Sequence, residues 1–182
     1  MIETERLMLR HWEAKDLPAF RAQSFDEEGM RYLIKLEDEA AFQAVLARLD
    51  LWRDTLGHTF WAVIRKSDGA FLGLCGLKLG NPGTAIEGEC EIGWRLGKEY
   101  WGQGYAREAA QAVLDWAWAQ LPVPRISAIT VLANMPSWGL MERLGMVRDH
   151  AADFDHPMVA EGSPLQPHIT YRINRPIVNH IA

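Results

Sequence analysis

The sequence predicts a mixed α/β (α+β) fold in which helices flank one sheet. Short runs of apolar and β-branched residues are separated by longer stretches in which apolar residues recur at helical spacing. The expected order is one strand, two helices, three strands, and then helix, strand, helix and strand. With 182 residues the chain can bury a sizeable core, and we expect residues 1–182 to form a single domain.

A strand and two helices are predicted at the N-terminal end. Residues 6–12 alternate in character, as in a half-buried strand. Asp16 and Pro18 mark the start of a short helix, since both residue types favour a first helical turn. Residues 37–57 carry apolar side chains at helical spacing, and Gly57 is a typical C-terminal stop.

Three strands are predicted next. Residues 58–66 and 70–79 form the first two, joined by a Ser-Asp-Gly turn. Residues 89–96 form the third and lead directly into a turn that is rich in glycine. Mixed α/β sheets usually bind ligands at the carboxyl ends of their strands, so this turn is a candidate binding site.

The C-terminal half is expected to alternate helix and strand. A helix is predicted over 106–119, a β-branched strand over 125–133 and a short proline-started helix over 134–145. A last strand covers 168–174. Residues 150–167 contain too much proline and glycine for regular structure, and long loops of this kind are often functional.

The composition excludes several classes of protein. The net charge of -5 provides no basic surplus for nonspecific nucleic-acid binding. Cys75 and Cys90 lie in apolar runs and are expected to be buried free thiols, which suits a reducing cytosol. Early charged residues argue against a signal peptide, and no apolar run approaches the ~20 residues of a membrane span. We therefore expect a cytoplasmic protein with no nucleic-acid, membrane or metal partner.

The glycine-rich turn has the features of an anion site. Gly102 and Gly104 flank Gln103 directly before an alanine-rich helix, whose first N–H groups and dipole favour a negative ligand. A dinucleotide fingerprint would need glycine or alanine where Arg107 stands, and no Walker motif is present. A turn with no ligand is the remaining alternative.

The turn resembles the pyrophosphate loop of the GNAT superfamily of N-acetyltransferases, with pattern [RQ]-x-x-G-x-[GA]. Its final G-x-[GA] is Gly104, Tyr105 and Ala106, while Trp101 replaces the first Arg or Gln, as is common in the Rim-type branch that acetylates ribosomal proteins. Three further segments resemble that branch in the same order, and the last predicted strand also fits. They are 3–20, "EIGWRL" at 91–96 and "ANMPSWGLMERLGM" at 133–146.

The resemblance implies a GNAT fold and an acetyl-CoA-dependent reaction. The expected sheet is mixed, mostly antiparallel, with about six to seven strands and about four helices, and it splays between its fourth and fifth strands. The acetyl group passes directly from acetyl-CoA to a peptide or small-molecule amine in a ternary complex, without a metal. The protein would be a monomer or homodimer.

The resemblance also implies a set of cofactor-binding residues. The N–H groups of the turn would hold the pyrophosphate, and the end of the 89–96 strand would hold the pantetheine arm through its backbone. The helix that begins near 134 would meet the cofactor from the opposite side. The residues carried over by position are Trp94, Arg95, Leu96, Gly102, Gln103, Gly104, Tyr105, Ala106, Arg107, Asn134 and Ser137.

Two residues are expected to act in catalysis. An amine of pKa ~10.4 costs roughly 4–5 kcal/mol to deprotonate at neutral pH, so a base helps. Glu91 matches a frequent family glutamate and is the first candidate, through a water, with Glu89 in reserve on the same strand face. Ser137 is the candidate acid toward sulfur. Glu91 could instead be an ordinary strand carboxylate, and Ser137 a hydroxyl that bonds its own helix start.

The acceptor is less defined by the sequence. In the 150–167 loop, Asp153 and Asp155 could attract a cationic amine, with Phe154 as an apolar contact and Glu89 nearby. A solvated hairpin or a dimer contact is the alternative for this loop. For the whole protein, the alternatives are a noncatalytic acyl-CoA sensor on the same fold and a nucleotide-dependent oxidoreductase.

Overall fold

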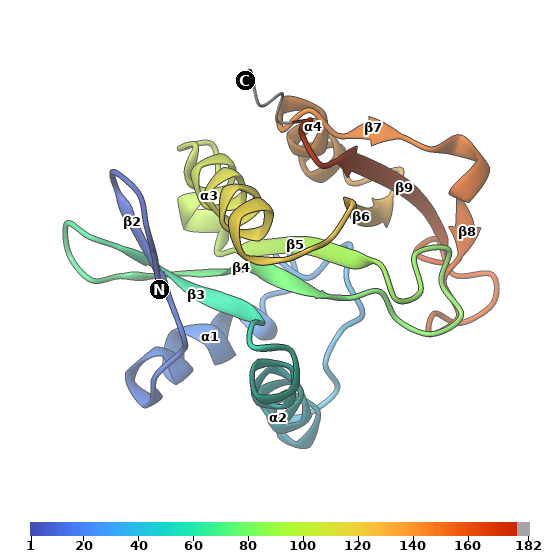
Figure 1. Ribbon diagram of the computed structural model, residues 1–182. Helices are drawn as coiled ribbons and strands as arrows, with labels where there is room; N and C mark the ends of the chain where they lie inside the picture. The colour runs from blue at the N-terminus through green and yellow to red at the C-terminus, as the bar shows by residue number, and fades with distance from the viewer. Residues whose placement is uncertain (178–182) are drawn as a thin grey trace, which may run out of the picture.

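One sheet forms the centre of the computed structural model, which describes residues 1–177 (Figure 1). Within these residues the sheet has nine strands in the order β1-β2-β3-β4-β5-β6-β9-β7, and β8 pairs with β9. Every strand pairing is antiparallel except that of β5 with β6, which is parallel. The predicted mixed, mostly antiparallel sheet is confirmed. That residues 1–182 form one domain stays a prediction, because residues 178–182 lie outside the described part.

Six of the strands correspond to the six predicted runs. The other three, β1, β7 and β8, contain two residues each and bring the sheet above the expected six to seven strands. The strands are β1 (Ile2–Glu3), β2 (Leu7–Arg10), β3 (Phe60–Arg65), β4 (Phe71–Leu79), β5 (Cys90–Leu96), β6 (Arg125–Val131), β7 (Val147–Arg148), β8 (Phe154–Asp155) and β9 (Pro167–Asn174).

The four predicted α-helices are present, and their ends follow the expected capping chemistry. Asp38 accepts a hydrogen bond from Ala41 N at 2.8 Å to start α2, which ends at Gly57 with φ of 74°. Three short 3₁₀ turns, η1, η2 and η3, accompany the helices. The bounds are η1 (Ala14–Asp16), α1 (Leu17–Ser24), α2 (Glu39–Leu56), η2 (Lys98–Tyr100), α3 (Tyr105–Gln120), α4 (Met135–Arg143) and η3 (His150–Ala152).

The helices cover both faces of the sheet, α1 and α2 on one side and α3 and α4 on the other (Figure 1). On the first face Phe20 and Phe42 pack edge to face, with ring centroids 5.3 Å apart. On the second face the small residues Ala109 and Ala110 let α3 approach the sheet closely. Each face therefore has its own apolar core.

The sheet opens between β5 and β6. Their pairing is limited to Cys90 with Ile126 and Glu91 with Ser127, although β5 continues to Leu96 and β6 to Val131. Beyond these two pairs the strands diverge, so the facing edge of β5 carries no strand. These are the expected fourth and fifth strands, since β1 adds one to the count. The predicted splay is confirmed.

The loop expected to lack regular structure is partly ordered by β9. Residues 150–167 include η3 and β8, and β8 pairs with Pro167 and His168 at the edge of the sheet. The prediction missed this strand because two residues carry no readable alternation. Further along, Pro157 lies against Gly83 of the β4–β5 connection. The loop therefore packs on the end of the sheet opposite the glycine-rich turn.

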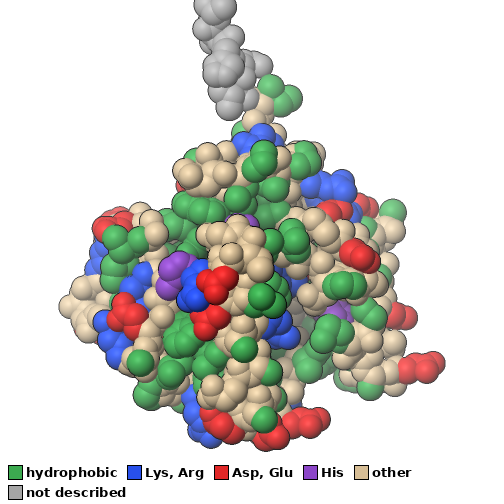
Figure 2. Space-filling view, turned by 60° about the horizontal axis from the view of Figure 1, so that its bottom comes forward, with side chains coloured by type: hydrophobic (Ala, Val, Ile, Leu, Met, Phe, Trp, Pro, Cys, Tyr) green, Lys and Arg blue, Asp and Glu red, His purple; other side chains and the backbone are tan. Residues whose placement is uncertain are grey.

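Both cysteines are buried and free, as predicted. Burial raises the pKa of the Cys90 thiol to about 11, and the nearby Glu91 charge adds to the shift. Within residues 1–177, no helix has the length and apolar character to cross a membrane. In Figure 2, which turns the α1 and α2 side forward, Lys and Arg side chains are interspersed with Asp and Glu.

Asp16 lies at the junction of η1 and α1, and its contacts there can be tested. Its buried carboxylate accepts hydrogen bonds from Arg10 Nη1 at 2.7 Å, from Arg10 Nη2 at 3.0 Å and from Glu13 N at 2.7 Å. Burial alone would raise the pKa of Asp16, but these bonds outweigh it and the pKa is lowered. Asp16→Asn should lower the free energy of unfolding by roughly 3 kcal/mol, because Arg10 loses its partner.

The pH dependence gives a second readout for Asp16. A carboxylate with a lowered pKa stabilises the fold above its unfolded pKa of ~3.9, and that contribution disappears as the pH falls through the folded value. Urea denaturation between neutral and acidic pH should show this loss in the native protein and a smaller one in Asp16→Asn. Asp115→Asn, on the exposed side of α3, should change stability by less than about 0.5 kcal/mol. Equal pH slopes for the native protein and Asp16→Asn would contradict this role.

Candidate active site

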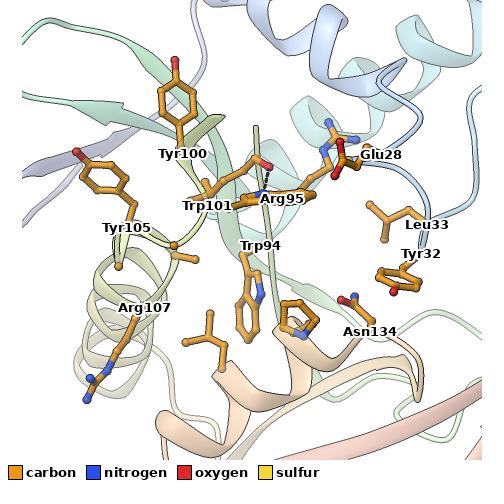
Figure 3. A pocket seen from close by; sticks show the side chains of 18 of the residues that line it. Glu28, Tyr32, Leu33, Trp94, Arg95, Tyr100, Trp101, Tyr105, Arg107 and Asn134 are labelled. Carbon is orange, nitrogen blue, oxygen red and sulfur yellow. Dashed lines mark hydrogen bonds between the residues drawn. The ribbon is translucent and has the colours of Figure 1, made fainter. Parts of the chain in front are cut away.

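A cavity of about 420 Å³ lies beside the open end of β5 (Figure 3). Four segments line it: residues 28–33 between α1 and α2, the end of β5, the segment 100–107 that includes the glycine-rich turn, and the start of α4. The cavity therefore combines segments from both faces of the sheet at the point where the sheet splays.

Most of the residues predicted to bind a cofactor line this one cavity. They are Trp94, Arg95, Leu96, Gly102, Gly104, Tyr105, Ala106, Arg107, Asn134 and Ser137. Gln103 does not line the cavity. Its side-chain amide donates to Glu99 O at 2.9 Å, and its backbone carbonyl accepts from Arg6 Nη1 at 3.1 Å. Gln103 thus holds the shape of the turn from outside.

The glycine-rich turn has the geometry of an anion cradle. Gly102 and Gly104 have φ of 72° and 82°, the left-handed region that favours glycine. Among the described residues, no oxygen accepts a hydrogen bond from the N–H groups of residues 102–107, and Gly104, the N-cap residue of α3, provides no side-chain cap. Consecutive donors without acceptors, at the positive end of a helix dipole, suit a phosphate group.

A carboxylate in the first turn of α3 is neutralised within the protein. Glu108 accepts hydrogen bonds from Thr4 Oγ1 at 2.6 Å, from Arg6 N at 2.9 Å and from Arg6 Nε at 2.7 Å. Burial raises the pKa of Glu108, but these donors lower it further than burial raises it. Glu108 is therefore ionised and paired, and it ties the β1–β2 connection to the first turn of α3. Because its charge is neutralised there, it does not cancel the positive potential at the start of α3.

The end of β5 presents alternate backbone groups to the gap. Gly97 N donates to Leu72 O at 2.9 Å, which points it toward β4. Because backbone direction alternates along a strand, the groups of Arg95 also face β4, while those of Trp94 and Leu96 face the open side. The backbone of Trp94 and Leu96 can therefore hydrogen-bond a ligand in the gap. Arg95 can instead contact a ligand through its side chain.

The start of α4 contributes polar groups from the opposite wall. Ser137 Oγ has no hydrogen-bond partner within residues 1–177, and its role as the acid stays a prediction. The Asn134 amide donates to Thr130 Oγ1 at 3.0 Å. Both residues line the cavity, with the Ser137 hydroxyl free to donate.

Glu91 lies at the apex of the splay but outside the cavity lining. It is the last residue of β5 that pairs with β6, and its buried carboxylate is ion-paired with Lys78 on β4. Burial raises the pKa of Glu91, while the Lys78 charge partly offsets the shift. Its side chain points to the α1 and α2 face, where Lys78 Nζ sits 6.0 Å from the Trp52 ring centroid.

Glu89 is held in a network away from the cavity. It accepts from Arg125 Nη2 at 2.6 Å, from Arg172 Nη2 at 3.0 Å and from the Ser127 hydroxyl. Burial raises the pKa of Glu89, and the bonds from Arg172 and Ser127 reverse the shift and lower it. Glu89 therefore joins β5 to β6 and β9 as an ionised structural carboxylate.

The loop residues predicted to bind the acceptor also lie outside the cavity lining. Asp153 pairs with Arg148 Nη2 at 2.6 Å and accepts from Thr170 N at 3.1 Å, which fixes the loop to β9. The Phe154 ring centroid lies 5.8 Å from that of His168, and Asp155 is exposed. The structure does not bring these residues to the cofactor side, and their acceptor role stays a prediction.

Sequence reasoning missed the wall formed by residues 28–33. In this segment Arg31 stacks on the Tyr32 ring at 4.8 Å and lies 5.9 Å from the centroid of Trp101, whose Nε1 donates to Leu96 O at 2.8 Å. The segment has no periodicity, so the clustering of Arg31 and Tyr32 between two helices was its only signal. The other lining residues that were missed are Glu28, Gly29, Leu33, Tyr100, Pro136, Leu140 and Arg143.

Comparison with known proteins agrees with this geometry. The family model described as "Acetyltransferase (GNAT) domain" matches residues 6–147, which include β2, the splay, the turn and α4. The chain belongs to the GNAT acetyltransferase family. The predicted superfamily is therefore confirmed, and with it an N-acetyltransferase assignment at the level of the family.

Individual GNAT proteins show how far the likeness extends. The chain is 30% identical over 155 residues to an uncharacterized N-acetyltransferase, p20, of Bacillus licheniformis, covering 81% of this chain and 85% of that one. A GNAT acetyltransferase structure from Bacillus anthracis has a TM-score of 0.77 at 26% identity, covering 96% and 98%. A ribosomal-protein-S5-alanine acetyltransferase from Vibrio fischeri has a TM-score of 0.70 at 18% identity, covering 95% of each chain, which is a likeness of fold alone.

No group of three or more His, Cys, Asp or Glu side chains within residues 1–177 is arranged to hold a metal ion. Besides the Glu28 carboxylate and three tyrosines, the polar groups that line the cavity include backbone N–H groups, the Ser137 hydroxyl, the Asn134 amide and guanidinium groups, which are hydrogen-bond donors. These are donors for phosphate, carbonyl and carboxylate oxygens.

The Lys78–Glu91 pair makes a stability prediction. Lys78→Met should cost roughly 3 kcal/mol, because it leaves a buried carboxylate without a counter-ion. The loss of unfolding free energy in the double variant Lys78→Met/Glu91→Gln should be smaller than the sum of the losses in the two single variants by about 1–3 kcal/mol. Urea denaturation measures these losses.

An exposed pair provides the control for this cycle. Arg21 Nε lies 2.6 Å from Glu39 Oε2, and both side chains are more than half exposed. Its double-mutant cycle should give a much smaller coupling, because solvent screens an exposed ion pair. A coupling at Lys78–Glu91 that is no larger than at Arg21–Glu39 would mean that Glu91 is hydrated rather than buried and paired.

Proposed function

We propose that this protein is a cytoplasmic N-acetyltransferase that transfers the acetyl group of acetyl-CoA to a primary amine by direct attack in a ternary complex. The observation that carries the proposal is the run of N–H groups at residues 102–107 without acceptors, at the mouth of the cavity beside the splay. Family membership supports acetyl transfer in general. The amine class and the roles of individual residues belong to the proposal.

The residues present fit acetyl-CoA. The turn and the first residues of α3 would bind its pyrophosphate. The backbone groups of Trp94 and the N–H of Leu96 would bind its pantetheine arm, while the Leu96 carbonyl already accepts from Trp101 Nε1. Arg107 extends along α3 away from the other labelled side chains and would act through its charge (Figure 3). Bound in this way, acetyl-CoA supplies an activated acetyl group whose thioester needs only an amine nucleophile.

Two residues of the chain would move protons. Ser137, which lines the cavity with a free hydroxyl, would donate toward the departing sulfur. Glu91 would take the proton of the amine through a water, and burial raises its pKa, which makes it a stronger base than an exposed carboxylate. Its position supports this role, because Glu91 is the last residue of β5 that pairs with β6 and so lies where the gap between the two strands begins.

One observation favours the alternative of a noncatalytic acyl-CoA sensor. The carboxylate of Glu91 is engaged by Lys78 and does not line the cavity. A protein without a base would bind acetyl-CoA but release no CoA with any amine. An amine panel with a colorimetric assay for the CoA thiol distinguishes the two functions directly.

The cofactor site predicts the behaviour of Gly104→Val. A β-branched side chain at φ of 82° would distort the turn and obstruct the N–H groups, so acetyl-CoA affinity should fall at least tenfold by calorimetric titration. Gly69→Val is the matched control, since Gly69 has φ of 73° in the β3–β4 turn with nothing within 4 Å of an added Cβ. It should lose similar stability and keep its affinity. Equal affinity in both variants would refute the phosphate cradle.

The proposed base predicts the behaviour of Glu91→Gln. Turnover of a high-pKa amine should fall roughly 10²-fold at neutral pH, and the loss should shrink as the pH rises, because free amine then forms without a base. Acetyl-CoA affinity should be unchanged. A loss that stays constant across the pH range would make Glu91 a positioning residue.

Glu89→Gln is the control for that experiment. Glu89 is a second carboxylate two positions away, held by arginines outside the cavity. Its substitution should lower the melting temperature without a pH-dependent loss of turnover. If Glu89→Gln shows that loss and Glu91→Gln does not, the reserve assignment is the correct one.

A further inference from the structure

We propose that Arg95 binds an anionic group of the acceptor, so that the substrate is an amine carrying a carboxylate or a similar oxyanion, as free amino acids do. This inference rests on the proposed function and names the substrate class for the same site. It concerns the part of the cavity that faces α1, on the other side of the sheet from the phosphate cradle.

Arg95 is a cation without a counter-ion among residues 1–177. Its Nη2 donates to Ser24 Oγ at 2.9 Å, its Nη1 donates to Met30 Sδ at 3.0 Å, and its guanidinium lies 5.4 Å from the centroid of the Phe20 ring. Within residues 1–177, no carboxylate oxygen lies within 4.0 Å of its nitrogens. Several of its donors are therefore left without a strong acceptor.

Other partly buried arginines in the described part of the chain have strong acceptors, which are carboxylates or, for Arg175, three backbone carbonyl oxygens. Arg10 pairs with Asp16 at 2.7 Å, Arg148 with Asp153 at 2.6 Å, and Arg172 with Glu89 at 3.0 Å. Burial lowers the pKa of Arg95 to about 10, which still leaves it charged at neutral pH. A buried charge without a partner is costly. A carboxylate or similar oxyanion of a bound ligand would supply the counter-charge and accept two parallel hydrogen bonds from the guanidinium.

The position of Arg95 assigns it to the acceptor rather than to the cofactor. Side chains alternate across a strand, and Trp94 packs on the α3 and α4 side while Arg95 points to α1 and residues 28–33 (Figure 3). The cradle at the start of α3 lies on the Trp94 side. An anion at Arg95 therefore belongs to a second ligand that enters between β5 and residues 28–33.

The charge of the cavity lining agrees with an anionic acceptor. Its charged side chains are Glu28 and four arginines, Arg31, Arg95, Arg107 and Arg143. Glu28 has its own partner, with 3.4 Å between its Oε2 and Lys98 Nζ. A polyamine or an aminoglycoside would carry several positive charges into this lining, whereas an amino acid carries a single ammonium group and a carboxylate to offset it.

The test compares matched amines and matched variants. Initial rates are measured at saturating acetyl-CoA for free amino acids, for their carboxamides and for spermidine. The proteins are the native chain, Arg95→Met, Arg95→Lys and the control Arg48→Gln. Methionine keeps the apolar contact with Phe20, and Arg48 is exposed on α2 and does not line the cavity, so its variant removes the same charge elsewhere.

We expect the native protein to prefer amino acids over carboxamides. Arg95→Met should raise KM for amino acids roughly 10- to 100-fold and leave KM for carboxamides and kcat nearly unchanged, the loss expected for one charge-assisted bidentate contact. Arg95→Lys should recover part of the difference, and Arg48→Gln should behave as the native protein. Equal effects on both amine classes, or a native preference for spermidine, would overturn the proposal and favour Asp153 and Asp155 as acceptor residues.

A binding arm separates failure of this inference from failure of the proposed function. If no amine is acetylated although acetyl-CoA binds, the protein is not an amine acetyltransferase. N-acetylamino acids and their carboxamides are then titrated calorimetrically into the CoA-loaded protein. Tighter binding of the carboxylates that disappears in Arg95→Met supports the anion site, and equal binding of the two classes overturns it. Melting curves confirm that each variant is folded.

Discussion

The short parallel pairing of β5 with β6 is the constraint on which the rest of the site depends. Hydrogen bonding between these strands ends after Glu91 and Ser127, so the next residues of β5 have one free backbone edge. The crossover between the two strands contains α3, and α4 follows β6, so both helices begin near the opening. A fully paired sheet would satisfy the backbone of Trp94 and Leu96 internally and would leave no gap for a ligand.

Much of this fold is readable from sequence, because its larger elements carry periodic patterns with defined ends. The β-branched run of β6 and the helical spacing in α2, closed by Gly57, each gave the right element. The strand β8 could not be predicted, because two residues have no measurable period and form a strand only where β9 lies beside them. The splay was likewise predicted from family resemblance alone, since no local pattern tells where a parallel pairing ends.

The site divides in the same way between local and long-range information. The left-handed turn at Gly102 and Gly104 was predictable because glycine, which has no Cβ, adopts positive φ at little cost. The partner of Glu91 was not, because Lys78 is brought opposite it by the β4–β5 register, which depends on the path of the connecting loop. Arg95 was assigned to the cofactor through its backbone, but the alternation of the strand directs that backbone to β4 and frees the side chain.

The alternation along β5 would let one strand contact the two proposed ligands. Trp94 and Leu96 belong to the face that α3 and α4 cover, and their backbone groups open onto the gap. Glu91, Gly93 and Arg95 share the other face. Gly93 has no side chain because Phe60 takes its place, with Cε1 only 2.9 Å from where a Cβ would stand. Phe60 thus separates the buried Glu91–Lys78 pair from the unpaired Arg95. In the proposed function, this separation keeps Glu91, the base, from neutralising Arg95, the residue that would bind the acceptor. The two opposite charges could then act on different atoms of one substrate.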